Sequence, residues 1–306
     1  MNAVERSVSF ASGDATLVGI AHVPSVALPT GMVMIVGGPQ YRVGSHRQFV
    51  LVARALAAAG HAVLRFDYTG MGDSTGTPRD FQSVSADIAA AIGALQRCVP
   101  DVRRVALWGL CDGASAALLY ADDSHDARVV GLCLLNPWVR SEVSLARTRV
   151  RHYYRQRLMQ REFWLKLISG KVAAGSLKGL VRGIRAAHGG AAAASDGRSF
   201  QDRMADAWCG FGGEILLFLS GNDFTAKEFA GYRESSARWA RASGHPRLTT
   251  RTLDGADHTF SNAAARAQVE HQTSAWLLAL AQTAERSGSR TAATTERSDH
   301  ERFRSV

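Results

Sequence analysis

The sequence predicts an α/β fold built on a mostly parallel, doubly wound sheet that one long helical insertion interrupts. Three observations predict this fold class. Apolar runs rich in Val, Ile and Leu recur along the chain, as expected for strands buried on both faces. Segments with the apolar spacing of amphipathic helices separate these runs. Alternation of strand and helix is typical of parallel sheets whose crossover helices cover both faces.

The individual elements follow in chain order. An antiparallel hairpin at 8–23, with its turn at Gly13 and Asp14, is expected at one edge of the sheet. The predicted buried strands span 32–36, 62–66, 105–108, 129–135 and 215–219, and a last strand spans 248–253. The predicted helices span 49–59, 84–95, 114–120 and 263–284.

The alternation stops after Asn136 and Pro137, and the next strand begins only near Glu214. We therefore expect an α/β core in two parts, 1–137 and 214–284, with a helical lid inserted at 138–213. The tail at 285–306 is polar and aperiodic, which predicts disorder. The chain carries a net charge of +9, yet 140–203 alone holds fourteen Lys and Arg against four Asp and Glu. This local charge of +10 assigns the basicity to the predicted lid.

Several classes of protein are disfavoured by the composition. The four cysteines, at 98, 111, 133 and 209, show no paired short spacing, so neither a zinc site nor a disulfide framework is expected. The glycine-rich run at 70–72 lacks the spacing of a dinucleotide-binding loop, and we expect no cofactor. No apolar run reaches the roughly 18 residues of a membrane span, and residues 1–14 lack an apolar signal core. These features predict a cytoplasmic protein.

A short motif follows the predicted strand at 105–108 and opens the predicted helix at 114–120. It reads Gly109-Leu110-Cys111-Asp112-Gly113, the G-x-S-x-G nucleophile elbow of α/β-hydrolases with cysteine in the serine position. Glycines let the backbone pass close to the sheet at this sharp turn. A side chain at such a turn faces a helix N-terminus, which favours both a thiolate and a developing oxyanion. We therefore predict Cys111 to be a nucleophile.

The partners of this nucleophile are expected later in the chain, first an acid and then a histidine. Asp223 follows the strand at 215–219, and His258 follows the last strand. His258 can act as the base toward Cys111, while Asp223 fixes its tautomer. Asp254 and Asp257 are rival acids, but Asp257 adjoins the histidine and Asp254 belongs to the same short loop.

An oxyanion hole is expected to combine two backbone N–H groups. One belongs to Asp112, the residue after the nucleophile. The other should come from the loop at 37–40, after the first parallel strand. Pro39 has no N–H, so Gln40 is the expected donor, with Tyr41 as an alternative.

Together the cysteine elbow, the 37–46 stretch Gly-Gly-Pro-Gln-Tyr-Arg-Val-Gly-Ser-His and the Phe66-Asp67-Tyr68 turn resemble the exosortase A system-associated hydrolase 1 family of the α/β-hydrolase superfamily. The resemblance covers about 8–280 and leaves the tail outside. It implies an enzyme linked to bacterial exopolysaccharide synthesis and protein sorting. The cysteine elbow is also similar to that of dienelactone hydrolases, although the long lid departs from those smaller enzymes.

These features predict hydrolysis of an ester or thioester through an acyl-enzyme on Cys111. The expected partner is a small acyl substrate, and the basic lid favours an anionic one. Acyl transfer to a saccharide is an alternative. Peripheral contact of the basic segment at 144–169 with anionic lipid is another. Nucleic acid is not expected, since no recognisable binding module is present.

Overall fold

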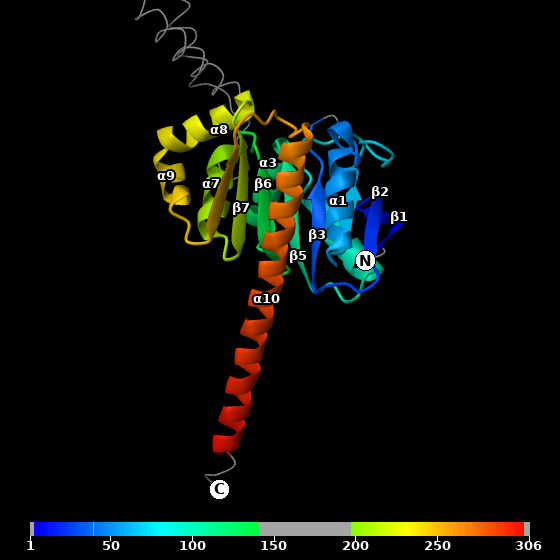
Figure 1. Ribbon diagram of the computed structural model, residues 1–306, viewed down its shortest axis with the longest axis vertical. Coiled ribbons are helices and arrows are strands. Elements are labelled where there is room, and N and C mark those ends of the chain that lie inside the picture. Colours follow the sequence, from blue (N-terminus) through cyan, green and yellow to red (C-terminus); the bar gives the residue numbers. More distant parts are fainter. Residues whose placement is uncertain (1–2, 39, 141–196, 303–306) are drawn as a thin grey trace, which may run out of the picture. The chain divides into compact units, whose positions relative to one another are not determined.

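The computed structural model describes residues 3–38, 40–140 and 197–302, with side chains up to 282 (Figure 1). The chain divides into two compact units, Met1–Trp138 with Arg203–Val306, and Val139–Asp202. The first, called the core unit, contains all the described strands. The predicted lid helix at 144–169 lies outside the described residues.

The core unit is built on an eight-stranded sheet with the order β1-β2-β4-β3-β5-β6-β7-β8. The strands are β1 (Ala3–Ser12), β2 (Ala15–Pro24), β3 (Thr30–Ile35), β4 (Val63–Phe66), β5 (Arg104–Leu110), β6 (Val129–Leu135), β7 (Glu214–Ser220) and β8 (Leu248–Leu253). Strand β2 pairs antiparallel with β1 and with β4, and all other neighbours pair parallel. The predicted fold class, a mostly parallel α/β sheet, is confirmed.

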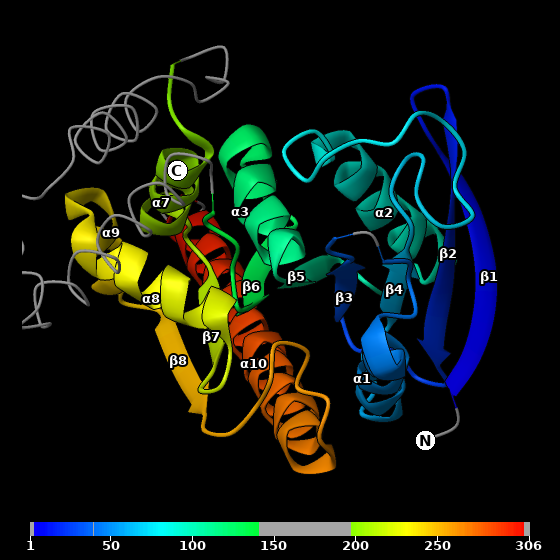
Figure 2. The same ribbon diagram turned by 90° about the horizontal axis from the view of Figure 1, so that it is seen from above.

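Helices cover both faces of this sheet (Figure 2). The helices are the 3₁₀ turn η1 (Ser45–Arg47), then α1 (Gln48–Ala58), α2 (Ser85–Cys98), α3 (Asp112–Ser124), α7 (Phe200–Gly210), α8 (Phe224–Ser235), α9 (Ala237–Ser243) and α10 (Ala263–Arg302). Helices α1 and α10 lie on one face, and α2 and α3 lie on the other (Figure 2). Every residue of β3 and β4 is buried as a result, including the polar Thr30 and the charged Arg65.

The helices differ from the sequence expectations in two places. Helices α8 and α9, absent from the predicted set, connect β7 to β8. Helix α10 continues to Arg302, beyond the expected end at 284 and into the tail expected to be disordered. The tail holds five Arg and three Glu, which have high helix propensity and favour continuation of the helix. Among the described residues no helix combines the length and apolarity needed to cross a bilayer.

The core unit resumes within α7, at Arg203, whose guanidinium contacts α3. Its Nε donates to Asp122 at 2.9 Å, and its Nη2 donates to Asp123, both on α3. This charge pair anchors α7 to the core, since both Arg203 and Asp122 are nearly buried.

Candidate active site

The turn between β5 and α3 has the geometry of a strained elbow. Cys111 adopts φ 60° and ψ −125°, a conformation that residues other than glycine rarely occupy. Its backbone is held on both sides, since its N–H donates to the carbonyl of Leu135 at 2.9 Å and its carbonyl accepts from Trp138 at 3.2 Å. The half-buried side chain of Cys111 thus lies at the carboxyl end of the parallel strands.

The two glycines of the elbow are required by close backbone contacts. A Cβ at Gly109 would lie 2.4 Å from the carbonyl of Gly113. A Cβ at Gly113 would lie 2.5 Å from the carbonyl oxygen of Ile35, on the neighbouring strand β3. Both distances are far below van der Waals contact, so any larger residue would force α3 away from the sheet. The two glycines of the motif therefore allow the close backbone approach that the sequence analysis expected.

The structure brings His258 and Asp223 together, although they are 35 residues apart. Nδ1 of His258 lies 3.0 Å from Oδ2 of Asp223. Asp223 is also the N-cap of α8, where the same Oδ2 accepts the N–H of Ala226 at 2.9 Å. Burial raises the pKa of Asp223, but the hydrogen bonds with His258 and Ala226 outweigh it, and the pKa lies below its usual value. The carboxylate form is therefore favoured beside His258.

His258 faces Cys111 as well as Asp223. The hydrogen bond with Asp223, followed by a hydrogen bond with the Cys111 side chain, raises the pKa of His258 to about 10, although burial opposes the shift. The imidazole is therefore protonated at neutral pH.

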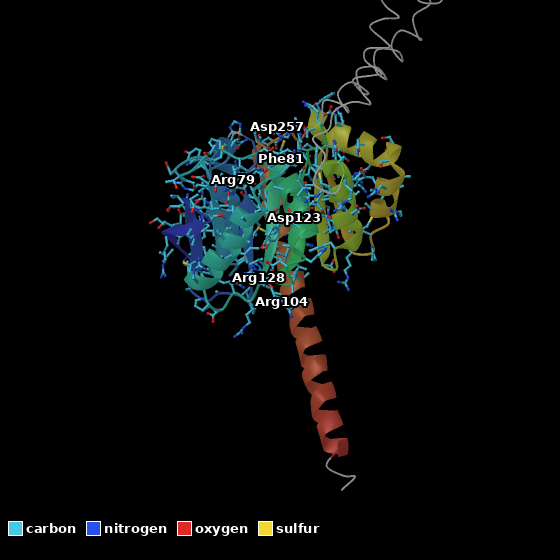
Figure 3. All side chains as sticks on the ribbon, turned by 180° about the vertical axis from the view of Figure 1, so that it is seen from behind. Arg79, Phe81, Arg104, Asp123, Arg128 and Asp257 are labelled. Carbon is cyan, nitrogen blue, oxygen red and sulfur yellow. The ribbon has the colours of Figure 1, made fainter. Side chains whose placement is uncertain are left out.

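The rival acids point elsewhere. Oδ1 of Asp257 accepts the N–H groups of Thr259 at 3.2 Å and Ser261 at 2.8 Å, and Oδ2 accepts the Ser261 hydroxyl. The Asp257 carboxylate thus stabilises the turn after His258. Asp254 is exposed. Figure 3 shows Asp257 at the end of the core unit opposite Arg104 and Arg128, which precede or begin parallel strands.

The expected oxyanion region lies where the 37–40 loop packs against the elbow. A Cβ at Gly37 would lie 2.3 Å from Oδ1 of Asp112 and 2.4 Å from the carbonyl of Leu110. The loop and the N-terminus of α3 are thus in direct contact. The side-chain carbonyl of Gln40 accepts the N–H of Ser45 at 3.0 Å, which folds the loop back on itself.

Asp112 contributes a half-buried carboxyl group that the sequence analysis did not consider. Burial raises its pKa, although the N–H groups of Gly38, Asp112 and Gly113 favour the charged form, as does His258. The N–H groups of Gly38 and of Asp112, the predicted donor, thus both act on the Asp112 carboxyl group. Gly38 has φ 63°, and the Gly-Gly sequence after a strand was the signal for a donor at this position.

The other cysteines differ from Cys111 in their surroundings. Cys133 is buried in β6, and burial raises the pKa of its thiol far above the usual value. Cys209 is exposed on α7, and Cys98 is half-buried at the end of α2. None of the three has an interaction with a histidine among the described residues. Within those same residues, no group of three or more His, Cys, Asp and Glu side chains is arranged to bind a metal.

The chain is similar to several known proteins. Over 134 residues it is 34% identical to the quorum-quenching protein AidA of Acinetobacter baumannii (strain MDR-ZJ06), and the match covers 41% of this chain and 42% of that protein. The chain thus matches less than half the length of this curated relative.

Solved structures share the fold at low sequence identity. An esterase of Pyrococcus furiosus superimposes with a TM-score of 0.61 at 15% identity, over 91% of each chain. A dienelactone hydrolase of Anabaena variabilis superimposes with a TM-score of 0.57 at 16% identity, over 91% of this chain and 98% of that one.

The family assignment rests on a longer sequence match than the one with AidA. The model of the Alpha/beta hydrolase family matches residues 32–271, from β3 into α10. This range includes the elbow and both loops that carry Asp223 and His258. The chain belongs to the alpha/beta hydrolase family.

Proposed function

We propose that the protein hydrolyses a carboxylic ester or thioester through a covalent acyl-enzyme on Cys111. One observation carries the proposal: Nδ1 of His258 lies 3.0 Å from Asp223, and the Cys111 side chain is close enough to His258 to help raise its pKa. Nucleophile, base and orienting acid in this relation are the arrangement that acyl transfer requires. Membership of the alpha/beta hydrolase family and the fold shared with an esterase agree with it.

The first half-reaction forms the acyl-enzyme. The Cys111 thiolate attacks the substrate carbonyl carbon, a C–S bond forms, and the carbonyl π pair moves to the oxygen. The oxyanion then collapses and breaks the bond to the leaving group. Protonated His258 gives its proton to the departing alkoxide or thiolate. The raised pKa of His258 suits this role, because the imidazolium is present when the leaving group departs.

The second half-reaction releases the acid. Neutral His258 takes a proton from water, and the resulting hydroxide attacks the acyl carbon. The second tetrahedral intermediate expels the Cys111 thiolate and leaves a carboxylic acid, while His258 is again protonated. Asp223 keeps Nδ1 of His258 as the donor, so that Nε2 faces the reaction.

The developing oxyanion is proposed to bind the N–H of Asp112 with a second N–H from the 37–40 loop. Gln40 is the donor expected from sequence, and Gly38 is the one whose N–H acts on the Asp112 carboxyl group. Each such donor stabilises the transition state by a few kcal/mol, which raises the rate about 10²–10³-fold.

The substrate is proposed to be anionic. The support is the local charge of +10 at 140–203, although most of that segment lies outside the described residues. We also propose membership of the exosortase A system-associated hydrolase 1 family and a cytoplasmic location, both on the sequence features already given. A saccharide hydroxyl in place of water as the acyl acceptor is the alternative reaction.

Incubation with short-chain p-nitrophenyl esters and with acyl thioesters tests the proposal. We expect turnover that Cys111→Ala abolishes, and selective labelling of Cys111 by a thiol-directed acylating probe over the other three cysteines. Cys209→Ala is the matched control, since Cys209 is the exposed thiol outside the site. Unchanged turnover in Cys111→Ala would refute the assignment. Product analysis with added saccharides separates hydrolysis from acyl transfer.

A further inference from the structure

Asn136, at the carboxyl end of β6, is fully buried and joins two strands to the His258 loop. Its Nδ2 donates to the backbone carbonyl of His258 at 3.0 Å and to the hydroxyl of Ser220 at 2.8 Å. Its Oδ1 accepts the N–H of Ser220 at 2.9 Å. The amide thus uses both of its ends, and the contact with His258 spans 122 residues of sequence.

Ser220 extends this connection by one step. The Ser220 hydroxyl donates to the backbone carbonyl of Asp257 at 2.8 Å. Two consecutive carbonyls, those of Asp257 and His258, therefore accept hydrogen bonds from side chains at the ends of β6 and β7. Buried polar networks in which every group has a partner hold one geometry, so this one fixes the backbone of the His258 loop.

The same segment also holds the nucleophile. Leu135, the residue before Asn136, accepts the N–H of Cys111, and Trp138, two residues after it, donates to the Cys111 carbonyl. Residues 135–138 therefore bind the backbone of Cys111 and, through Asn136, the backbone of His258. A shift of this segment would change the distance between the sulfur and the imidazole.

Asparagine suits both the backbone conformation and the hydrogen bonds found at position 136. Asn136 has φ 45°, in the left-handed region that asparagine occupies more readily than most residues. An amide is also the side chain that can donate to two acceptors while accepting from an N–H. Aspartate lacks the donor, and glycine has the backbone freedom without the side chain.

We propose that Asn136, with Ser220, is a positioning residue that sets His258 within reach of Cys111, an inference that rests on the proposed function. The two side chains act on the backbone of the His258 loop and do not touch the substrate. Their effect is therefore expected in the chemical step and in the reactivity of the Cys111 sulfur, with little effect on substrate binding.

The test is the rate at which iodoacetamide alkylates Cys111, measured against pH in the full-length protein and located by peptide mapping. In the wild type we expect fast alkylation through the neutral range, because His258 lies beside the sulfur and activates it. In Asn136→Gly, which tolerates the positive φ, alkylation near pH 7 should be slower and should approach the wild-type rate only as the pH rises. The kcat for the ester should fall about 10²-fold at nearly unchanged KM.

Asn262→Gly is the matched control. Asn262 caps α10 by accepting the N–H of Ala265 at 2.8 Å, so the same substitution there removes a structural hydrogen bond outside the site. We expect it to lower the thermal midpoint slightly and to leave the alkylation profile and kcat as in the wild type. A purely structural role for Asn136 would give this same pattern in Asn136→Gly.

Ser220→Ala gives a second, milder variant, and it decides the question if Asn136→Gly does not fold. It removes the bond to the Asp257 carbonyl and one acceptor of the Asn136 amide, but it leaves the bond from Asn136 to the His258 carbonyl. It should shift the alkylation profile in the same direction by a smaller amount. A wild-type profile in the folded variants overturns the proposal. If the wild type hydrolyses no ester, the proposed function fails, whereas the alkylation profiles still decide the role of Asn136.

Discussion

The carboxylate of Asp223 has two partners, His258 and the first turn of α8. Its Oδ2 lies 3.0 Å from Nδ1 of His258 and accepts the N–H of Ala226 at 2.9 Å. One side chain thus stabilises a helix and orients the imidazole. The two roles can be separated by substitution, because asparagine caps helices as well as aspartate does.

We therefore expect Asp223→Asn to keep the helix cap of α8 but to lose activity, together with the stability that the charge pair with His258 contributes near neutral pH. The asparagine oxygen can still accept from Ala226, but the amide cannot stabilise the imidazolium, so kcat should fall by on the order of 10³–10⁴. Asp223→Ala should lose activity and also about 1 kcal/mol of unfolding free energy, because the cap is removed. Urea unfolding and ester kinetics on both variants check this. Equal kcat in Asp223→Asn and wild type would contradict it.

The raised pKa of His258 predicts a pH-dependent stability. A group whose folded pKa, about 10, exceeds its ordinary value of 6.5 stabilises the fold fully below pH 6.5, and this contribution is lost as the pH rises toward 10. The difference in unfolding free energy between wild type and His258→Gln should therefore shrink from pH 6 to pH 10. Urea titrations at several pH values measure it. A difference that stays constant over this range would show that the imidazole is not held as a cation.

The lowered pKa of Asp223 predicts a loss of stability at acidic pH. Its contribution is present above its ordinary value of 3.8 and is lost as the pH falls through its folded pKa. Asp223→Asn should therefore lose less stability than the wild type upon acidification. Thermal unfolding below pH 4 compares the two.

Close packing at the elbow predicts that Gly113→Ala is strongly destabilising and inactive. The new methyl group would overlap the carbonyl oxygen of Ile35 at 2.5 Å, so α3 or β3 must move. Gly231→Ala is the control, since Gly231 lies in α8 with no atom within 4 Å of its Cβ position. There alanine should stabilise the helix by up to about 1 kcal/mol. Thermal unfolding of both variants, with ester kinetics, tests the contrast, and a soluble, active Gly113→Ala would contradict it.

The 37–46 loop is fastened to the core by Arg42. The Arg42 guanidinium pairs with the buried Asp67 and donates to Asp73 at 2.6 Å. The backbone N–H of Arg42 also donates to the Asp67 carboxylate, at 2.6 Å. Arg42→Met leaves the Asp67 carboxylate buried without its cation, which typically costs about 3–5 kcal/mol. We expect a large loss of stability and a lower kcat, because the loop carries the proposed oxyanion donors. Arg54→Met, which removes the exposed pair with Glu5, should change neither; equal effects of the two substitutions would refute this role.

Local patterns predicted most of the sheet. The hairpin turn at Gly13, with φ 57°, and the buried strands from β3 to β7 lie close to their predicted ranges, because buried parallel strands are continuous apolar runs. Helices α8 and α9 were not predicted. Their few buried residues, such as Phe229 and Trp239, give a weak apolar pattern that sequence alone does not separate from a loop.

The sequence by itself determined where the nucleophile is expected, because the elbow is a contiguous motif whose glycines are needed for backbone contacts within a few residues. It also determined the chain order of Cys111, Asp223 and His258. The tertiary structure decided which acid faces His258, since Asp257 turns back onto Ser261. It also decided that Asn136 and Ser220 hold the His258 loop. Contacts between residues so distant in sequence leave no local spacing to read, and only the packing of β6, β7 and β8 brings these groups within hydrogen-bonding distance.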